Sequence, residues 1–397
     1  MKRVVITGLG ITCGIGNDIH TFSENLACMK SGILPFSIFD SGKYTVKIGS
    51  TVHGLEKKLS PRILNLPRPL QFLWNATQDA LTQSGIMDSI NPQRIGTYVA
   101  GPACSLLEVE NYYRTYVNQG LAATQRHDLT YANWDSAVNE ISRQFSIMGP
   151  RNTILTACSS SGVAIGLATD LIRLGEVDAM IAAGTDGFSE FTFSGFQSLN
   201  SISPVPCRPF DQDRAGLSFG EGAGVLVLED YDRAVKRGAV ILAEIAGYGA
   251  VGEGYNLTAP HPEAIGFIKT MNRAMKMAQV CPDEISYINA HGTATPINDA
   301  VEGYAIRKLF GDRDLPVNSI KSLVGHCMGA AGAVEAVNTV LTLMHNMIPG
   351  TLNCTTPDQN IPITVVQNTI ERQLNYALCN SAGFGGNNSS VLFKRFA

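Results

Sequence analysis

The sequence has little charge and no long apolar run. Only 16% of its 397 residues are charged and the formal net charge is −4, which gives no electrostatic basis for binding nucleic acid. No stretch reaches the ~18 consecutive apolar residues that a membrane-spanning helix needs. Both absences favour a soluble protein that binds neither nucleic acid nor membrane, and we expect it in the cytoplasm.

Motifs of several other chemistries are also missing. The nine cysteines include no C-x-x-C pair, which argues against a zinc module. Their odd number suits a reducing compartment better than a disulfide framework. There is no Walker A sequence and no H-E-x-x-H. Gly8 and Gly10 interrupt the apolar start of the chain, which predicts a first buried strand and its turn instead of a signal peptide.

What is present is a large apolar content, 45% of residues, arranged as short apolar runs that alternate with helical patterns. This alternation is typical of a mostly parallel sheet covered by helices on both faces. Strands are predicted at Val4–Thr7, Ile154–Ala157, Val177–Ala183, Gly224–Leu228, Ile241–Ile245 and Ile285–Asn289. Helices are predicted at Phe72–Ser84, Val163–Leu174, Gly266–Ala278, Asp299–Leu309 and Ala330–His345.

Two segments suggest an internal duplication. Asn152–Gly175 and Asn318–Asn346 each run from a strand through a reactive residue and a small-residue turn into a helix. Two similar halves that meet at these turns would bring their functional residues together. The charged stretch Tyr231–Gly238 predicts the boundary, which gives an N-terminal half over 1–235 and a C-terminal half over 236–397.

Cys158 is the first candidate for chemistry. It lies on the turn between a predicted strand and the helix that begins after Ser159-Ser-Ser161-Gly162. A thiol there faces the positive end of the helix dipole, so we expect a lowered pKa and a reactive thiolate. The alternative is a small buried core residue, since free Cys is among the most buried residue types.

Two later segments carry further reactive side chains. His291 follows a predicted strand, at the end where open α/β sheets place ligand sites. Lys321 and His326 flank a tight turn, and we expect Glu302 to hold the Lys321 ammonium. A fixed ammonium would orient His326 and favour its neutral form. For His291, the alternative is a ring bonded to the backbone within its own turn.

Three glycines surround Phe384 in the segment Gly383-Phe-Gly-Gly386. Glycine permits close backbone approach and positive φ, so N–H groups there could form an oxyanion hole. A glycine hairpin before a last strand at Ser390–Lys394 is the alternative.

In this order and context, these residues resemble the elongating β-ketoacyl-acyl carrier protein synthases, the decarboxylating condensing enzymes of synthase I/II type in the thiolase-fold superfamily. The resemblance covers essentially the whole chain. It implies an α/β fold, a thiolase-like five-layer αβαβα sandwich made of two similar halves. The matching segments are Thr156-Ala-Cys158, Arg208-Pro-Phe-Asp211, Gly220-Glu-Gly-Ala-Gly224, Asn289-Ala-His-Gly-Thr293, Lys321-Ser, Gly325-His326 and Gly383-Phe-Gly-Gly386.

The resemblance also implies a reaction. Cys158 would accept an acyl chain, and the N–H groups of Cys158 and Phe384 would hold the tetrahedral oxyanion. His291 and His326 would donate to the enolate that forms when malonyl-carrier protein loses CO2. The carbanion would attack the acyl thioester to give a β-ketoacyl product in fatty acid, polyketide or polyene-type synthesis. A decarboxylase or acyltransferase that rarely condenses, or a subunit active only with a homologous partner, are the alternatives.

The same resemblance implies the supporting residues and partners. Thr293 and Thr295 would line the pantetheine tunnel, Glu302 would anchor Lys321, and Phe384 would gate the pocket. No intrinsic metal or redox cofactor is implied, since the acyl carrier protein supplies the phosphopantetheine thioester. The partners would be that carrier protein and a second chain, in a homodimer or a heterodimer with a homologous ketosynthase-like chain.

Carrier proteins are typically acidic, so we expect a basic docking patch. A simple solvated face is the alternative for these charges. The candidates are Lys57, Lys58, Arg62, Arg68 and Arg126.

Three segments could alter the acyl pocket. Ser159-Ser-Ser161 replaces the small residues usual after the nucleophile, and Ala382 stands where an aromatic residue often lies. Gly187–Phe193 and Ser105–Leu107 either line an acyl pocket or form ordinary core.

Overall fold

The computed structural model describes residues 2–101 and 105–396, and an eleven-stranded sheet runs through these ranges. In spatial order its strands are β12 (Thr364–Val365), β10 (Pro316–Asn318), β9 (Ile285–Asn289), β14 (Tyr376–Gly383), β15 (Asn387–Arg395), β8 (Ala243–Gly252), β1 (Val4–Cys13), β7 (Gly222–Asp230), β6 (Ala179–Asp186), β4 (Ile95–Ala100) and β5 (Arg151–Ile154). The pairings are mixed, so the prediction of a mostly parallel sheet is wrong. A local pattern cannot reveal a pairing such as that of Val4 with Asp230.

The strand order repeats along this sheet. β1, β7, β6, β4 and β5 are joined by two antiparallel pairings followed by two parallel ones. β8, β15, β14, β9 and β10 repeat the same order with the same directions. The two units meet where β1 pairs with β8. An internal duplication produces this kind of repeated order.

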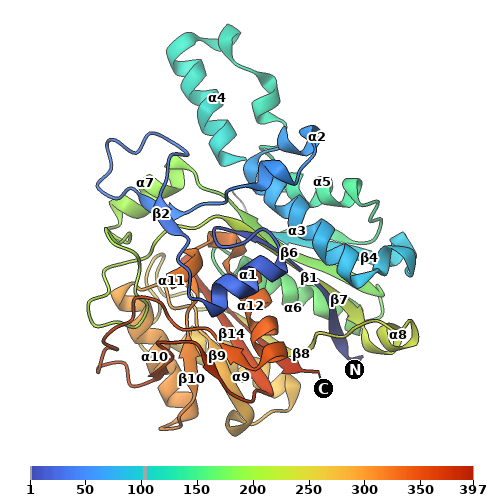
Figure 1. The fold of residues 1–397 in the computed structure, drawn as a ribbon, viewed down its shortest axis with the longest axis vertical. Coiled ribbons are helices and arrows are strands. Elements are labelled where there is room, and N and C mark those ends of the chain that lie inside the picture. Colours follow the sequence, from blue (N-terminus) through green and yellow to red (C-terminus); the bar gives the residue numbers. More distant parts are fainter. Residues whose placement is uncertain (1, 102–104, 397) are drawn as a thin grey trace.

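Helices separate and cover the two units, as Figure 1 shows. α6 (Ser160–Arg173) and α12 (Ala331–His345) pack on each other and contact strands of both units, so they form a central layer. α3 (Arg68–Ser84) covers β1 and β7, while α9 (Ile265–Ala278) covers β8 and β15. The arrangement is the thiolase-like five-layer αβαβα sandwich that the resemblance implies.

Glycines let these layers approach one another. A Cβ at Gly332 would lie 3.0 Å from the Gly162 nitrogen, so α6 and α12 cross at two glycines. A Cβ at Gly10 would lie 1.8 Å from the Ala76 carbonyl oxygen in α3. β1 therefore continues through Gly8 and Gly10 as a buried strand, and the turn predicted there is wrong.

The other elements lie around this framework. No helix in the two described ranges is long and apolar enough to cross a membrane. The remaining helices are α1 (Ile19–Ala27), α2 (Pro61–Leu64), α4 (Leu106–Gln119), α5 (Ser136–Gln144), α7 (Glu190–Ser198), α8 (Tyr231–Lys236), α10 (Pro296–Phe310) and α11 (Lys321–Val324), and the short strands are β2 (Ile33–Pro35), β3 (Ile48–Ser50), β11 (Met347–Ile348) and β13 (Ile370–Glu371).

Candidate active site

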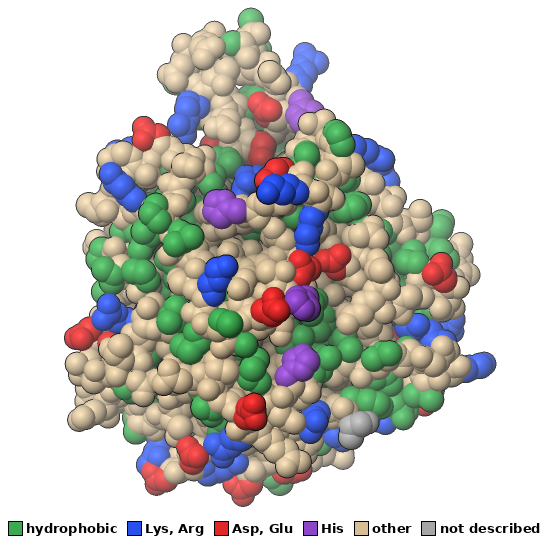
Figure 2. All heavy atoms as spheres, in the orientation of Figure 1, with side chains coloured by type: hydrophobic (Ala, Val, Ile, Leu, Met, Phe, Trp, Pro, Cys, Tyr) green, Lys and Arg blue, Asp and Glu red, His purple; other side chains and the backbone are tan. Residues whose placement is uncertain are grey.

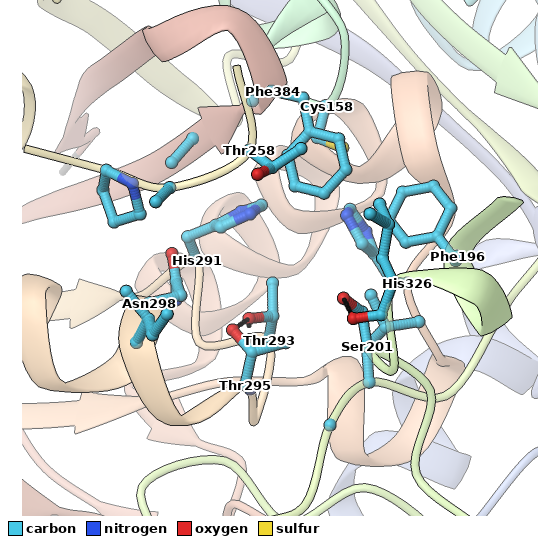
Figure 3. Close-up of a pocket in the computed structure, with 18 of the residues that line it drawn as sticks. Cys158, Phe196, Ser201, Thr258, His291, Thr293, Thr295, Asn298, His326 and Phe384 are labelled. Atoms are coloured by element: carbon cyan, nitrogen blue, oxygen red, sulfur yellow. Dashed lines mark hydrogen bonds between the residues drawn. The ribbon is translucent and has the colours of Figure 1, made fainter. Parts of the chain in front are cut away.

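One cavity of about 320 Å³ collects the reactive side chains. Cys158, His291 and His326 line it, and Figure 3 shows both imidazole rings directed into the same space. These residues come from three distant segments, so the fold is what brings them together. The wall also includes other residues named from the sequence, among them Thr293, Thr295, Ala382 and Phe384.

Cys158 lies on the turn between β5 and α6. The preceding residue, Ala157, has a φ of 52°, a left-handed conformation that is uncommon for a residue with a Cβ. Two serine hydroxyls hold the turn: Ser159 Oγ donates to the Thr156 carbonyl at 2.7 Å, and Ser160 Oγ donates to the Ala157 carbonyl at 2.5 Å. The serines that follow Cys158 therefore support its backbone.

The Cys158 thiol is protonated in the free protein. Its side chain is only 8% exposed, and burial raises the pKa of the thiol to about 12. The positive charge of Lys321 acts in the opposite direction but is the smaller effect. The predicted lowering of the Cys158 pKa is therefore wrong, because desolvation of a thiolate outweighs the favourable charges around it.

Lys321 lies buried beside His291. Its ammonium donates to the His291 carbonyl oxygen at 2.6 Å, and Nζ lies 3.3 Å from His291 Nδ1. An ammonium can only donate, so Nδ1 accepts and the ring proton of His291 is on Nε2. The ion-pair partner of Lys321 is Glu335 on α12, so the prediction that Glu302 anchors it is wrong.

Glu302 instead holds the loop that carries His291. Its two carboxylate oxygens accept from the backbone N–H groups of His291 at 2.8 Å and Gly292 at 2.9 Å. The sequence did contain a signal for the true partner of Lys321. Glu335 is the sole acidic residue in the helix predicted at Ala330–His345, and an isolated carboxylate in so apolar a helix needs a buried cation.

The His326 segment is fixed through its backbone. The His326 N–H donates to the Ser218 carbonyl at 2.7 Å, and the His326 carbonyl accepts from Gly220 at 3.0 Å. Ser218 is the central residue of a G-x-S-x-G match that begins at Gly216. It is buried, and its Oγ accepts from the Cys207 N–H at 3.0 Å, so it supports these loops and is no nucleophile.

Both histidines are neutral at physiological pH. Burial is the larger cause and the Lys321 charge the second, and together they hold the pKa of His291 and of His326 well below 6.5. The two ring centroids lie 5.3 Å apart with the planes at 84°. Nδ1 of His326 is buried and has no hydrogen-bond partner among the described residues. The cavity thus holds a thiol and two neutral imidazoles.

The glycine loop lies directly against the turn that carries Cys158. A Cβ at Gly383 would lie 2.9 Å from the Thr156 carbonyl oxygen and 3.0 Å from the Cys158 nitrogen, so a larger residue would require the backbone to shift. The Phe384 ring stacks on Phe196 of α7, with centroids 5.2 Å apart and planes at 17°. Phe196 lines the cavity but was not predicted from the sequence.

The two threonines of the cavity wall are bonded to each other, with Thr293 Oγ1 and Thr295 Oγ1 2.8 Å apart. Because each hydroxyl can donate and accept, the pair keeps a hydrogen-bonding capacity toward the cavity.

The basic residues predicted to dock a carrier protein divide into two groups. Lys57, Lys58, Arg62 and Arg126 are exposed, and Lys58 pairs with Asp18 at 2.7 Å. Arg68 is partly buried and forms an ion pair with the buried Glu221, so it does not belong to a surface patch. Figure 2 shows Lys and Arg scattered over the visible face.

The chain matches two family models, "Beta-ketoacyl synthase, N-terminal domain" over residues 1–234 and "Beta-ketoacyl synthase, C-terminal domain" over residues 242–355. It is 34% identical over 408 residues to 3-oxoacyl-[acyl-carrier-protein] synthase 2 of Coxiella burnetii, with 99% of both chains covered.

Two solved structures share the fold over the full length of both chains. The ishigamide ketosynthase/chain length factor has a TM-score of 0.95 at 30% identity. A type II polyketide synthase acyl-carrier protein in complex with its ketosynthase, bound to the hexaketide, has a TM-score of 0.92 at 27% identity.

Proposed function

Because the chain belongs to the β-ketoacyl synthase family, we propose that Cys158 is the nucleophile of a decarboxylative condensation in this protein. Family membership makes the chain an acyltransferase, a condensing ketosynthase of fatty acid or polyketide synthesis. The observation that carries the assignment of roles is the single cavity lined by Cys158, His291 and His326.

In the first step, the Cys158 sulfur attacks the carbonyl carbon of an acyl-carrier protein thioester. The carrier's pantetheine sulfur leaves as a thiol, taking up the proton that Cys158 loses. The N–H groups of Cys158 and Phe384 stabilise the oxyanion, a contribution of about 3 kcal/mol per donor in comparable sites. The closeness of Gly383 to the Cys158 nitrogen supports this pairing of donors.

In the second step, malonyl-carrier protein loses CO2, and the electron pair of the broken bond forms an enolate. His291 and His326 donate to the enolate oxygen, which a neutral ring can do through one N–H. The carbanion then attacks the acyl thioester carbon and expels the Cys158 thiolate, giving a β-ketoacyl-carrier protein; the thiolate takes up one proton from solvent to restore the thiol. Lys321 acts on this step as a positioning residue, because it fixes the His291 tautomer.

The carrier protein brings its own phosphopantetheine arm, and we assign the cavity to it, with Thr293 and Thr295 along its path. The carrier protein complexed with a related ketosynthase supports this partner. We retain Lys57, Lys58, Arg62 and Arg126 as the docking patch for an acidic carrier.

A homologous chain is the second proposed partner. α4 projects from the body of the protein in Figure 1, and none of its side chains is buried. Contiguous exposed apolar groups of this kind mark interaction surfaces. The likeness to a ketosynthase/chain length factor supports a homologous chain as the occupant, in a homodimer or heterodimer. The exposed apolar side chains of this surface are Tyr113, Tyr116, Val117 and Leu121.

Two further assignments remain predictions. The eight described cysteines are free thiols, which supports a reducing compartment and hence the cytoplasm. The division into halves over 1–235 and 236–397 places the boundary at the end of α8.

The test is the variant Cys158→Ala, which removes the sulfur and leaves the fold intact. We expect condensation to fall by about 10³-fold or more, measured by mass spectrometry of the carrier-bound product. Cys354→Ala is the matched control, because Cys354 is a buried thiol outside the cavity. Full condensing activity in Cys158→Ala would contradict the proposal.

A further inference from the structure

Cys158 belongs to two different environments. It lines the cavity, and it also belongs to a buried apolar cluster on the inner side of the site. Four of its nine buried side chains are aromatic, and three partly buried aromatic side chains pack against them. We call it the aromatic cluster and define it by Phe36, Phe39, Tyr44, Phe188, Phe193 and Phe219.

The aromatic cluster is closely packed around Phe193, which is fully buried. The centroid of its ring lies 5.3 Å from that of Tyr44 and 5.4 Å from that of Phe219. Phe188 presses on the backbone of β3, because a Cβ at Gly49 would lie 2.3 Å from the Phe188 ring. Rings held at such distances cannot turn aside without moving their neighbours.

Condensation needs both substrates in the site at once. The acyl group stays on the Cys158 sulfur while the malonyl-bearing pantetheine arm occupies the cavity of about 320 Å³. The acyl chain must therefore extend from Cys158 away from the cavity, into the aromatic cluster. The ring centroids of neighbouring members of the cluster lie 5.0 to 6.5 Å apart, so a long chain entering it would have to displace these rings.

The far side of Phe188 is also unfavourable for an apolar chain. A small cavity of about 10 Å³ lies there, roughly the size that holds one water molecule. Its wall includes Arg68, Glu108 and Glu221, and Arg68 forms an ion pair with the buried Glu221. A long acyl chain that passed Phe188 would end against these charges and remove their solvation.

We propose that this ketosynthase is specific for short acyl groups, and that Phe193 sets the limit on chain length. The inference rests on the proposed role of Cys158 and adds the substrate class. The segment Gly187–Phe193 is thus the inner wall of the acyl site and determines specificity.

The experiment follows acylation of Cys158 by intact-mass spectrometry, using the purified protein with any homologous chain that co-purifies. The probes are acetyl-, butanoyl- and dodecanoyl-carrier protein. We expect the dodecanoyl group to react slower than the acetyl group by about tenfold or more. Phe193→Leu should raise the dodecanoyl-to-acetyl ratio of rates by a similar factor, because the smaller side chain opens space within the cluster to which Cys158 belongs.

Phe22→Leu is the matched control. Phe22 is equally buried but belongs to a different cluster, so its loss should leave the ratio of rates unchanged. A ratio separates specificity from any general loss of folded protein. Equal rates for dodecanoyl and acetyl groups in the unchanged protein would overturn the chain-length inference and leave the proposed function standing. Absence of any acyl group on Cys158 with all three probes would overturn both.

Discussion

The environment of each reactive side chain, more than its identity, sets its chemical state in this protein. Cys158 is a thiol because burial raises its pKa to about 12, and the two histidines are neutral because burial lowers theirs. Lys321 differs from these groups because an ion pair with Glu335 compensates its buried ammonium. A lone cation in that position would have no solvent to stabilise it.

The substitution Glu335→Gln tests that compensation. It leaves the Lys321 charge buried without its partner, and removal of one member of a buried pair costs about 3–5 kcal/mol. We expect the free energy of unfolding, measured by urea denaturation, to fall by about that amount. Glu302→Gln is the control, since it removes no partner of a cation. It loses one of the two acceptors at the His291 and Gly292 N–H groups, so we expect a smaller loss of about 1–3 kcal/mol. Equal losses in both variants would contradict the assignment of Glu335 as the counter-ion.

At the scale of elements, the periodicity of apolar residues predicted the bounds of two helices well. It could not predict which distant segments pack or pair with each other. The predicted helices at Gly266–Ala278 and Ala330–His345 agree with α9 and α12 to within one residue, because buried faces recur along a helix. The predicted strand at Ile154–Ala157 instead ends at Ile154, since Ala157 takes a left-handed turn. Mixed pairing and the ion pair of Lys321 depend on contacts between distant segments, which no local pattern contains.

None of the side chains of α4 is buried in a single chain. A charge placed on its exposed apolar face should weaken association with a second chain, because the charge would have to be desolvated. We expect Val117→Asp to lower the dimer fraction measured by light scattering after gel filtration. Val240→Asp is the control, because Val240 is similarly exposed, at 75% against 61% for Val117, but lies outside α4. An unchanged dimer fraction in Val117→Asp would remove α4 from the interface.

For the whole molecule, buried ionisable groups make stability depend on pH in two opposing ways. His291 and His326 have folded pKa values well below 6.5, so the unfolded state binds more protons below that pH. Their contribution is present above pH 6.5 and is lost as pH falls. Burial raises the pKa of Asp186 and of Glu302 to about 7, so these groups favour the folded state in acid and lose that contribution as pH rises toward 7.

The contribution of His326 to this pH dependence of stability can be measured with the variant His326→Asn. We expect the free energy of unfolding of the unchanged protein, relative to this variant, to decrease below pH 6.5 by up to about 1.4 kcal/mol per pH unit. Above that pH the difference should be constant. Urea denaturation at a series of pH values measures it, and a difference that does not vary with pH would show that His326 titrates normally in the folded protein.

The position of the two chain ends in the repeated sheet also permits a circular permutation of the sequence. Val4 of β1 and Phe393 of β15 both pair with Ile245, from opposite sides of β8, so the two ends of the described chain are neighbours in Figure 1. A circular permutant that links these ends by a short connector and opens the chain at exposed Gly238 would preserve every strand pairing. The residues after Gly238 would then be synthesised first, so Cys158, the proposed nucleophile, would follow His291 and His326.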